Sequence, residues 1–465
     1  MLKNAYLQES DRFEQMVPRV LLAGTNSGCG KTTVVCGVLQ ALINRNMKVG
    51  AFKCGPDYID PMFHSEIIGA KSANLDLFFF CGNTARYLMA RKGGESDICV
   101  IEGVMGYYDG LGMTTTKASS YEVAQVTDSP VVLIVDAKGA ALSVLATIHG
   151  FLTMYPDNHI RGVILNRCSS MAYPALEQAI CQRFAGAVQP LGYLPQKPEY
   201  ALESRHLGLV TADEVDNLKD KMTALAQQVE QTIDLDGLLH LAKTAAPLCG
   251  QTVSCTVYET PVRIGVARDR AFCFYYEDNL QLLSDMGAEL VEFSPLTDQA
   301  LPENLNGLYL GGGYPELYAR QLSANQTMLD SIRKALEVKL PCIAECGGFM
   351  YLTEEIGGHP MVGYLPGTCF HTGKLKRFGY VTLTAGKDNL LCGAGEQIPA
   401  HEFHHWDCTQ PGDDFTAEKM NGTSWNCIVA TEHLYAGYPH FHFYANPNAA
   451  KRFYEACLKE CEARV

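Results

Sequence analysis

The chain has 465 residues, of which 47% are hydrophobic and 19% charged, and it carries a formal net charge of −14. This length suits two or more folded domains, and the composition excludes a disordered chain. The acidity argues against a nucleic-acid-binding protein. Since neither an apolar leader nor a run of about 18 apolar residues occurs, we expect a cytoplasmic protein that does not bind membranes.

The 18 cysteines are scattered, and no two of them form a Cys-x-x-Cys pair. In a protein without a secretory leader, this spacing favours free thiols over a disulfide framework. We therefore expect most of them to be small buried hydrophobic side chains in a reducing compartment.

Residues 1–16 are predicted to be a loose lead-in, after which short apolar runs alternate with helical patterns. This alternation predicts an α/β fold, with a parallel sheet covered by helices on both faces. The predicted strands of this first half are 20–24, 49–53, 98–102, 131–136 and 162–166, and a helix is predicted over 31–45.

The sharpest local signal follows the first strand, where residues 24–33 read Gly-Thr-Asn-Ser-Gly-Cys-Gly-Lys-Thr-Thr. A glycine-rich turn between a strand and a helix is typical of a P-loop, whose backbone amides surround phosphates. Lys31 is then expected to reach the β- and γ-phosphates of ATP, and Thr32 to ligate Mg²⁺. The predicted ATP-binding residues of the loop are Gly28, Gly30, Lys31, Thr32 and Thr33.

The loop departs from the strict P-loop spacing by one residue. The first glycine of that pattern would fall at position 25, where Thr25 stands, whereas Gly24 comes one residue earlier. This lengthened loop resembles that of the dethiobiotin synthetase and cobyrinate amidase branch of P-loop proteins. Partition ATPases carry a signature lysine where this chain has Asn26.

Acidic residues follow two further predicted strands. Asp57 and Asp60 lie just after the second strand, and Glu102 and Asp109 lie at and beyond the third. Because ligands of parallel α/β sheets bind at the carboxyl ends of the strands, we predict that Thr32, Asp57 and Glu102 hold magnesium. The alternative is that the aspartates only form turns.

Asn166 ends the fifth predicted strand. An asparagine at this edge of the sheet can hydrogen-bond the edge of an adenine, so Asn166 is a candidate ATP-binding residue. A loop-capping role is the alternative.

A second α/β series begins near residue 263. Its predicted strands are 264–267, 289–293, 307–310 and 342–344, and its predicted helices are 279–286 and 328–338. The segment between about residues 236 and 260 lacks a strong strand signal before Thr252 and is predicted to contain the linker between domains.

Cys346 follows the last of these strands and precedes a helix-like segment. A cysteine at such a sharp, glycine-flanked bend is typical of a nucleophile, and the helix start is expected to lower the pKa of its thiol. Backbone amides of Gly312, Gly313 and Gly347 are predicted to stabilise an oxyanion.

A base for this cysteine is predicted late in the domain, in the run His-Phe-His-Phe. His440 is the first choice and His442 the alternative. The run His-Glu-x-x-His at 401–405 fits a zinc-protease motif, but that motif requires a helix. Because Pro399 precedes it and no amphipathic pattern follows, we expect an aromatic-rich strand or loop without zinc.

Together these segments resemble the cobyrinic acid a,c-diamide synthase family over about residues 17–447. The matching motifs are the lengthened P-loop, Gly-Pro-Asp-Tyr-Ile-Asp-Pro, Glu-Gly-Val-Met-Gly-Tyr-Tyr-Asp-Gly, Gly-Gly-Gly-Tyr-Pro-Glu, Glu-Cys-Gly-Gly-Phe-Met-Tyr-Leu, His-Glu-Phe-His and His-Phe-His-Phe. Each motif alone is unspecific, but their order in one chain is highly specific.

The resemblance implies a dethiobiotin synthetase-like P-loop domain followed by a class I glutamine amidotransferase-like domain. The expected division is a lead-in at 1–16, the ATP- and substrate-binding domain at 17–235, a linker at 236–260, the amidotransferase domain at 261–450 and a C-terminal helix at 451–465. The third acid of the usual amidotransferase triad is not evident after His440, so a Cys–His pair is expected to be enough.

The resemblance also implies the reaction. ATP with Mg²⁺ would phosphorylate the a and c acetate carboxylates of a tetrapyrrole, and ammonia from L-glutamine would displace the phosphate. By resemblance, Asp57, Tyr58, Asp60 and Asp109 handle the substrate and the intermediate. The expected partners are these small molecules, with no nucleic acid and no membrane, and a homodimer is left open.

Several alternatives are left open by the sequence. The tetrapyrrole could be cobyrinate, hydrogenobyrinate or nickel-sirohydrochlorin, the last in coenzyme F430 biosynthesis. A larger enzyme of the cobyric acid synthase type, which amidates other side chains, is a second reading. A reading from another class is a regulatory P-loop ATPase with an inactive amidotransferase domain.

Overall fold

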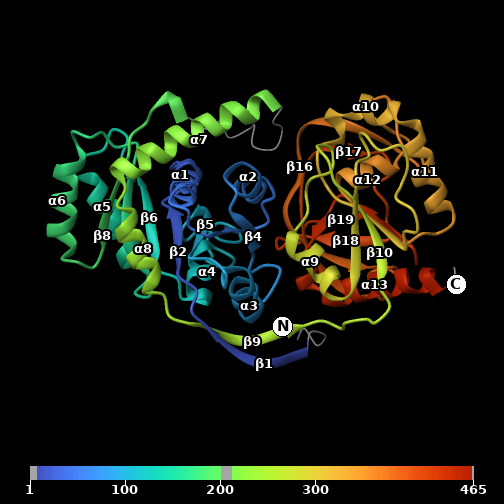
Figure 1. Ribbon diagram of the computed structural model, residues 1–465, viewed down its shortest axis with the longest axis horizontal. Helices are drawn as coiled ribbons and strands as arrows, with labels where there is room; N and C mark the ends of the chain where they lie inside the picture. Colours follow the sequence, from blue (N-terminus) through green and yellow to red (C-terminus); the bar gives the residue numbers. More distant parts are fainter. Residues whose placement is uncertain (1–7, 201–211, 463–465) are drawn as a thin grey trace. The chain divides into compact units, whose positions relative to one another are not determined.

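The computed structural model describes residues 8–200 and 212–462, and the chain divides into two compact units. The first spans Glu9–Val253, and the second begins at Ser254. Each unit is built on a parallel sheet with helices against it (Figure 1), so the predicted α/β class is confirmed. In the described residues, no helix is long and apolar enough to cross a membrane.

The first unit contains a sheet of seven parallel strands. In spatial order they are β4 (Lys71–Leu75), β3 (Val49–Cys54), β5 (Ile98–Gly106), β2 (Arg19–Gly24), β6 (Val131–Asp136), β7 (Ile160–Asn166) and β8 (Gln189–Leu194). The five strands predicted for this half are therefore confirmed. They read as continuous apolar runs because helices bury them on both faces.

Helices connect these strands or follow the last of them. They are α1 (Lys31–Asn44), α2 (Ile59–Phe63), α3 (Gly82–Gly93), α4 (Ser120–Thr127), α5 (Ser143–Met154), α6 (Tyr173–Phe184), α7 (Ala212–Thr232) and α8 (Leu235–Lys243), with short turns η1 (His64–Ile68) and η2 (Pro198–Tyr200). Buried side chains of α1, α7 and α8 share one hydrophobic core with the sheet. Figure 1 shows α7 running alongside α1.

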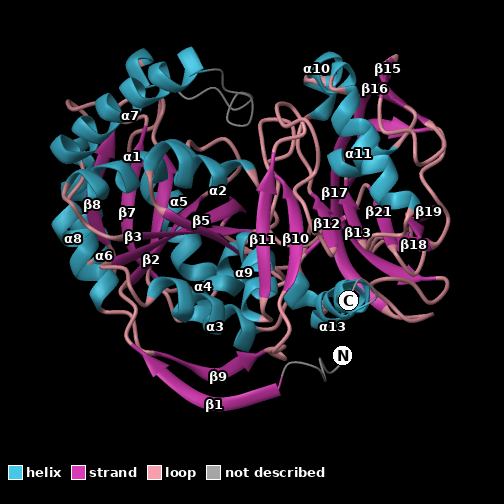
Figure 2. Ribbon diagram, turned by 45° about the vertical axis from the view of Figure 1, so that its right-hand side comes forward, coloured by secondary structure: helices cyan, strands magenta, loops and turns pink. Residues whose placement is uncertain are grey.

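The expected lead-in and linker both contain regular structure. Strand β1 (Gln8–Gln15) lies within 1–16 and pairs with β9 (Leu248–Ser254), as Figure 2 shows. Helix α8 lies almost wholly within 236–260, and its Leu238 is fully buried in the core of the first unit. Residues 236–243 are therefore not a linker, because their apolar face packs against that core.

The second unit contains a six-stranded sheet, parallel except for its last strand. In spatial order the strands are β11 (Ala288–Phe293), β10 (Val262–Ala267), β12 (Gly307–Leu310), β13 (Cys342–Glu345), β21 (Leu434–Gly437) and the antiparallel β20 (Val429–Ala430). All four strands predicted for this half are confirmed. The helices and helical turns are α9 (Glu277–Asp285), η3 (Pro315–Leu317), α10 (Ala319–Ala324), α11 (Gln326–Glu337), α12 (Gly347–Leu352), η4 (Phe443–Ala445) and α13 (Pro447–Glu462).

A second, largely antiparallel sheet completes this unit. Its strands are β14 (Glu355–Ile356), β15 (His359–Pro360), β16 (Thr368–Ala385), β17 (Gln397–Cys408), β18 (Phe415–Glu418), β19 (Ser424–Cys427) and β22 (His440–Phe441). The long pair β16–β17 changes register twice between His371 and Gly379. Because β22 pairs with β17, this sheet reaches the segment that carries His440.

Candidate functional site

The P-loop lies between β2 and α1 at the carboxyl edge of the first sheet. Gly28 and Gly30 adopt positive φ angles of 80° and 84°, which L side chains rarely adopt. Gly30 caps α1, and a Cβ there would lie 2.1 Å from the side-chain nitrogen of Asn166. The loop conformation therefore depends on glycine at both positions.

Asn166 and Arg167 hold this loop from the end of β7. The Asn166 amide donates a hydrogen bond to the carbonyl of Cys29 at 2.7 Å. Arg167 donates to the carbonyl of Gly28 at 3.1 Å and forms an ion pair with Asp136. The Asn166 contact is the loop-capping arrangement that the sequence left open, and its role towards adenine stays a prediction. Arg167 was missed because its partner is a backbone carbonyl.

A buried charge network lies beside the P-loop. Lys53 on β3 and Glu102 on β5 are register partners on adjacent strands, and their Nζ and Oε1 atoms are 2.9 Å apart. The same Oε1 accepts from Lys31 Nζ at 3.1 Å and from the Thr32 hydroxyl at 2.8 Å. The fold thus brings together Lys31, Thr32 and Glu102, as the sequence predicted, around Lys53, which it did not.

The acidic loop after β3 also reaches Lys53. The Lys53 Nζ donates to the Asp60 carboxylate and lies 4.0 Å from that of Asp57. The other oxygen of Asp57 accepts from the backbone amides of Ile59 and Asp60 at the start of α2. Asp57 therefore forms the turn that the sequence left as an alternative, while its second oxygen faces the network.

Burial and charge set the pKa values in this network. Burial opposes the negative charge of Glu102, but Lys53 and Lys31 outweigh it and hold its pKa well below the usual range. Burial and the neighbouring Glu102 raise the pKa of Asp60 to about 6. Burial also opposes the positive charge of Lys53, yet Glu102 and Asp60 raise its pKa well above the usual value. Glu102 thus carries its negative charge at neutral pH.

The donor set fits a magnesium ion. Glu102 Oε2 is buried without a hydrogen-bond partner, 3.3 Å from His64 Nε2, and the Thr32 hydroxyl lies at Oε1. Carboxylate and hydroxyl oxygens are the ligands that Mg²⁺ prefers alongside phosphates and water. Among the residues the structure describes, no group of three or more His, Cys, Asp or Glu side chains could hold a metal by itself.

Three further predicted residues lie near these elements. Thr33 follows Thr32 in the first turn of α1, and Tyr58 is buried just before α2. Asp109 is exposed, and its carboxylate accepts from the backbone amide of Gly106 at 2.9 Å. The role of Asp109 towards a substrate stays a prediction.

A second cluster lies at the carboxyl edge of the main sheet of the second unit. Gly311–Gly313 follow β12, Cys346 follows β13, and His440 follows β21. These three strands are neighbours and run parallel, so their carboxyl ends meet at one edge. The topology thus brings together the predicted nucleophile, the glycine turn and the predicted base.

Cys346 stands at a strained bend between β13 and α12. Its φ and ψ are 49° and −99°, and its amide donates to the carbonyl of Gly437 at 2.7 Å. Burial, and secondarily the Glu316 carboxylate, raise the pKa of the Cys346 thiol. The expectation of a lowered pKa is therefore wrong for this structure, because burial outweighs the short helix. A base must remove the thiol proton.

The glycines of the predicted oxyanion pocket face one another. A Cβ on Gly347 would lie 3.1 Å from the backbone nitrogen of Gly313. A Cβ on Gly312 would lie 2.5 Å from Cε1 and 3.3 Å from Nε2 of His440. The imidazole therefore packs directly against the glycine turn, which leaves no space for a larger residue at position 312.

His440 and His442 have different surroundings. His440 Nδ1 lies 3.0 Å from the Glu345 carboxylate, and its ring packs on Gly312. His442 Nδ1 accepts from the amide of Tyr444, and its Nε2 lies 4.0 Å from Asp278. Because His440 contacts the glycine turn at Gly312, the geometry favours His440 over His442 as the candidate base. Glu345 was not predicted because it lies 95 residues before His440, whereas an acid was expected after that histidine.

The run at 401–405 lies on strand β17, one of the two forms, strand or loop, expected from Pro399 and the missing amphipathic pattern. Glu402 is fully buried and pairs with His404 at 2.9 Å, whereas His405 is exposed. His401 pairs in register with His440 on β22. The helical geometry of the zinc motif is therefore absent from this segment.

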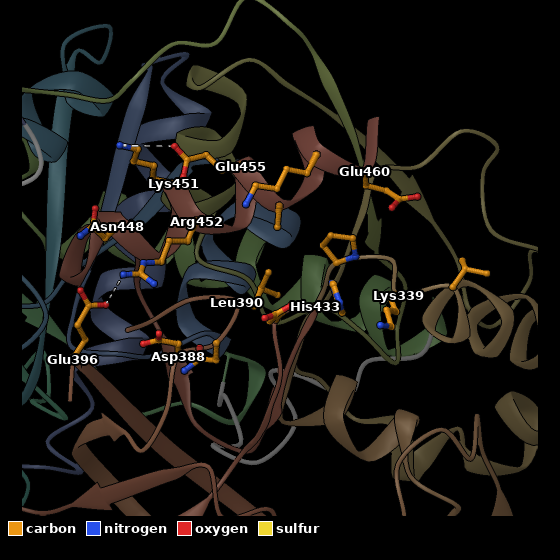
Figure 3. A pocket seen from close by; sticks show the side chains of 16 residues that line it. Lys339, Asp388, Leu390, Glu396, His433, Asn448, Lys451, Arg452, Glu455 and Glu460 are labelled. Atoms are coloured by element: carbon orange, nitrogen blue, oxygen red, sulfur yellow. Dashed lines mark ion pairs between the residues drawn. The ribbon is translucent and has the colours of Figure 1, made fainter. Parts of the chain in front are cut away.

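A polar groove of about 910 Å³ also lies on the second unit (Figure 3). Pro341 and His433, which line it, directly precede β13 and β21, so the groove lies at the amino ends of those strands. Arg452 and Glu396 form an ion pair of 3.4 Å across its lining. The groove is therefore at the opposite edge of the sheet from Cys346 and is not the same site.

Comparisons with known proteins agree with this division. Residues 20–210 match the family described as the CobQ/CobB/MinD/ParA nucleotide binding domain, and residues 263–448 match the CobB/CobQ-like glutamine amidotransferase domain. The chain is 39% identical to the cobyrinate a,c-diamide synthase of Clostridium acetobutylicum, over 92% of this chain and 97% of the relative. The same-named proteins of Listeria monocytogenes (40% identical, 92% and 97% covered) and Caldanaerobacter subterraneus (38%, 94% and 98%) are similar to it as well.

Proposed function

Because this chain belongs to the cobyrinate a,c-diamide synthase family, we propose that it amidates the a and c acetate carboxylates of a cobalamin-type tetrapyrrole. It is a glutamine-dependent, amide-forming ligase with a nucleotide-binding unit and an amidotransferase unit. The observation that carries the proposal is the near-complete coverage of relatives that bear this one name. The geometry of the two sites supports a division of labour between the units.

In the amidotransferase unit, Cys346 attacks the side-chain amide of glutamine. His440 accepts the thiol proton and returns it to the departing ammonia, and water then hydrolyses the thioester to glutamate. Amides of Gly312, Gly313 and Gly347 stabilise the negative oxygen of the tetrahedral intermediate. The packing of His440 on the glycine turn supports this assignment.

In the nucleotide-binding unit, ATP converts a carboxylate into an acyl phosphate with release of ADP. The P-loop amides between Gly28 and Thr33 surround the phosphates, and Lys31 neutralises the charge that develops on them. Thr32 and Glu102, with Asp57, would hold Mg²⁺, which when bound neutralises phosphate charge. Asp60 and Tyr58 line the approach of the acceptor carboxylate. Ammonia then displaces inorganic phosphate and leaves the carboxamide.

The tetrapyrrole is tested by offering cobyrinate, hydrogenobyrinate and nickel-sirohydrochlorin separately, each with ATP, Mg²⁺ and glutamine. We expect two successive mass losses of about one unit on cobyrinate, as each hydroxyl is replaced by an amine. Amidation of one of the other two compounds instead would identify that compound as the substrate. Glutamine hydrolysis without amidation of any of the three would contradict the proposed acceptor.

The regulatory alternative is tested in the same reactions. A regulatory ATPase with an inactive amidotransferase unit would not hydrolyse glutamine, and Cys346→Ala would then behave like the parent protein. The meeting of Cys346, the glycine turn and His440 at one sheet edge supports the enzyme instead.

A further inference from the structure

The carboxylate of Glu345 lies inside the amidotransferase site. Glu345 is the last residue of β13, directly before Cys346, and is 1% exposed. Its Oε2 lies 3.0 Å from His440 Nδ1, and its Oε1 accepts a 2.7 Å hydrogen bond from the Tyr309 hydroxyl. Both oxygens thus have defined partners, as a buried carboxylate requires.

This contact fixes the orientation of the His440 ring. A carboxylate at Nδ1 keeps a proton on that nitrogen, so Nε2 is the nitrogen that accepts one. The Nε2 edge faces the glycine turn, because a Cβ on Gly312 would lie 3.3 Å from Nε2 and 2.5 Å from Cε1. The acid therefore lies at Nδ1, and the glycine turn lies against the Cε1–Nε2 edge of the same imidazole.

A second histidine covers the face of the same ring. His401 stacks on His440 with ring centroids 5.2 Å apart and planes inclined by 25°, and its Nδ1 lies 3.3 Å from the Tyr276 hydroxyl. Burial, and secondarily His440, lower the pKa of His401 well below its usual value. His401 thus remains neutral and does not compete with His440 for the Glu345 carboxylate.

We propose that Glu345 is the positioning acid of this amidotransferase site. It directly precedes the nucleophile Cys346, whereas the usual triad acid would follow the base His440. The Glu345 carboxylate holds the Nδ1–H tautomer of His440 and stabilises the imidazolium that forms when Nε2 takes the Cys346 proton. This inference rests on the proposed glutaminase function. It replaces the expectation that a Cys–His pair acts without an acid.

The test is Glu345→Gln, which keeps the side-chain size and removes the charge. We expect the glutaminase kcat to fall by about 10²–10⁴-fold, as for loss of a triad acid, with KM for glutamine changed less than about threefold. The pH profile of kcat should shift upwards, because thiolate must then form without an oriented base. Alkylation of Cys346 by iodoacetamide, followed by peptide mass spectrometry, should slow in parallel.

Three further variants separate positioning from structure. Tyr309→Phe removes the second hydrogen bond to the same carboxylate and should lower kcat by less than about tenfold. Asp407→Asn removes another buried carboxylate of this unit, paired with Arg377 at 3.3 Å, and should leave the pH profile unchanged. Glu345→Asp retains the charge and should keep the parent pH profile at a reduced rate.

Failure of the Glu345 proposal can be distinguished from failure of the proposed glutaminase function. Amide formation from added ammonia should persist in Glu345→Gln, because that reaction needs no glutaminase. A folded Glu345→Gln protein with parent kcat and pH profile would overturn the proposal. If that variant does not fold, a shifted pH profile in Glu345→Asp, which keeps the charge, would overturn it instead. Absence of glutamine hydrolysis in the parent protein would instead contradict the proposed function.

Discussion

Lys53 is a buried amine that faces carboxylates from two adjacent strand ends. Its Nζ lies 2.9 Å from Glu102 and 4.0 Å from Asp57, and it also donates to Asp60. If Lys31 moves to the phosphates of a bound nucleotide, Lys53 remains as the lysine that balances these three acids. The residue thus stabilises the site before ATP and magnesium bind.

Replacing Lys53 by Met should therefore lower the stability of the protein more than replacing a lysine on the surface would. We expect the free energy of unfolding to fall by about 3–5 kcal/mol, because uncompensated charges remain buried. Urea denaturation measures this change. The matched control is Lys71→Met, which breaks the exposed pair with Glu95 and should cost less than about 1 kcal/mol.

The double variant Lys53→Met/Asp60→Asn checks the cause. Since Asp60→Asn removes one of the carboxylates that Lys53 balances, the double variant should lose less stability than the sum of the single variants. Additive losses would show that the lysine stabilises the unit by packing alone.

At the scale of the element, the start of α1 depends on a contact between the P-loop and β7. Gly28 and Gly30 have nearly the same φ, 80° and 84°, but different neighbours. A Cβ at Gly30 would collide with Asn166, whereas a Cβ at Gly28 would meet nothing within 4 Å. The two positions thus separate backbone strain from steric collision.

We expect Gly28→Ala to lower the free energy of unfolding by about 1–2 kcal/mol through backbone strain alone. Gly30→Ala should cost more and should weaken ATP binding further, because Asn166 must move away from the Cys29 carbonyl. Urea denaturation and calorimetric titration with ATP measure both effects. Equal losses in the two variants would contradict the role assigned to Asn166.

The elements that could be predicted from the sequence are those that are buried along their whole length. Parallel strands such as β2 and β6 are apolar throughout because both of their faces are covered, so their sequences reveal them. Strand β16 is half exposed and irregular in register, and the second sheet was accordingly missed. Of the site residues, Lys31 and Cys346 stand in recognisable motifs.

Glu345 and Lys53 could not be predicted in the same way. Each acts through a partner that is distant in sequence, at positions 440 and 102, and only the pairing of neighbouring strands brings them together. The predicted linker at 236–260 contains the boundary between the units at Val253, but it starts too early. Helix α8 occupies the start of this segment: Asp234 caps the helix, and its apolar face packs on the first unit.

At the scale of the whole molecule, the proposed function assigns ammonia production and carboxylate activation to different units. Cys346→Ala should abolish glutamine-dependent amide formation but preserve formation from added ammonia. Lys31→Ala should abolish synthesis from either donor and weaken ATP binding, yet preserve basal glutaminase activity. Parallel assays of glutamate, ADP and amide measure these three outputs, and loss of ammonia-dependent synthesis in folded Cys346→Ala would contradict the division.

The bend at Cys346 also has a consequence for how the protein can evolve. A non-glycine residue at φ 49° and ψ −99° costs of the order of 1–3 kcal/mol, which packing of the surrounding unit must offset. Selection for thermal stability alone would favour glycine at this position and so remove the thiol. Under the proposed function, selection on catalysis keeps the conformation that presents the Cys346 sulfur. This conformation leaves the amidotransferase unit a smaller margin for destabilising substitutions elsewhere.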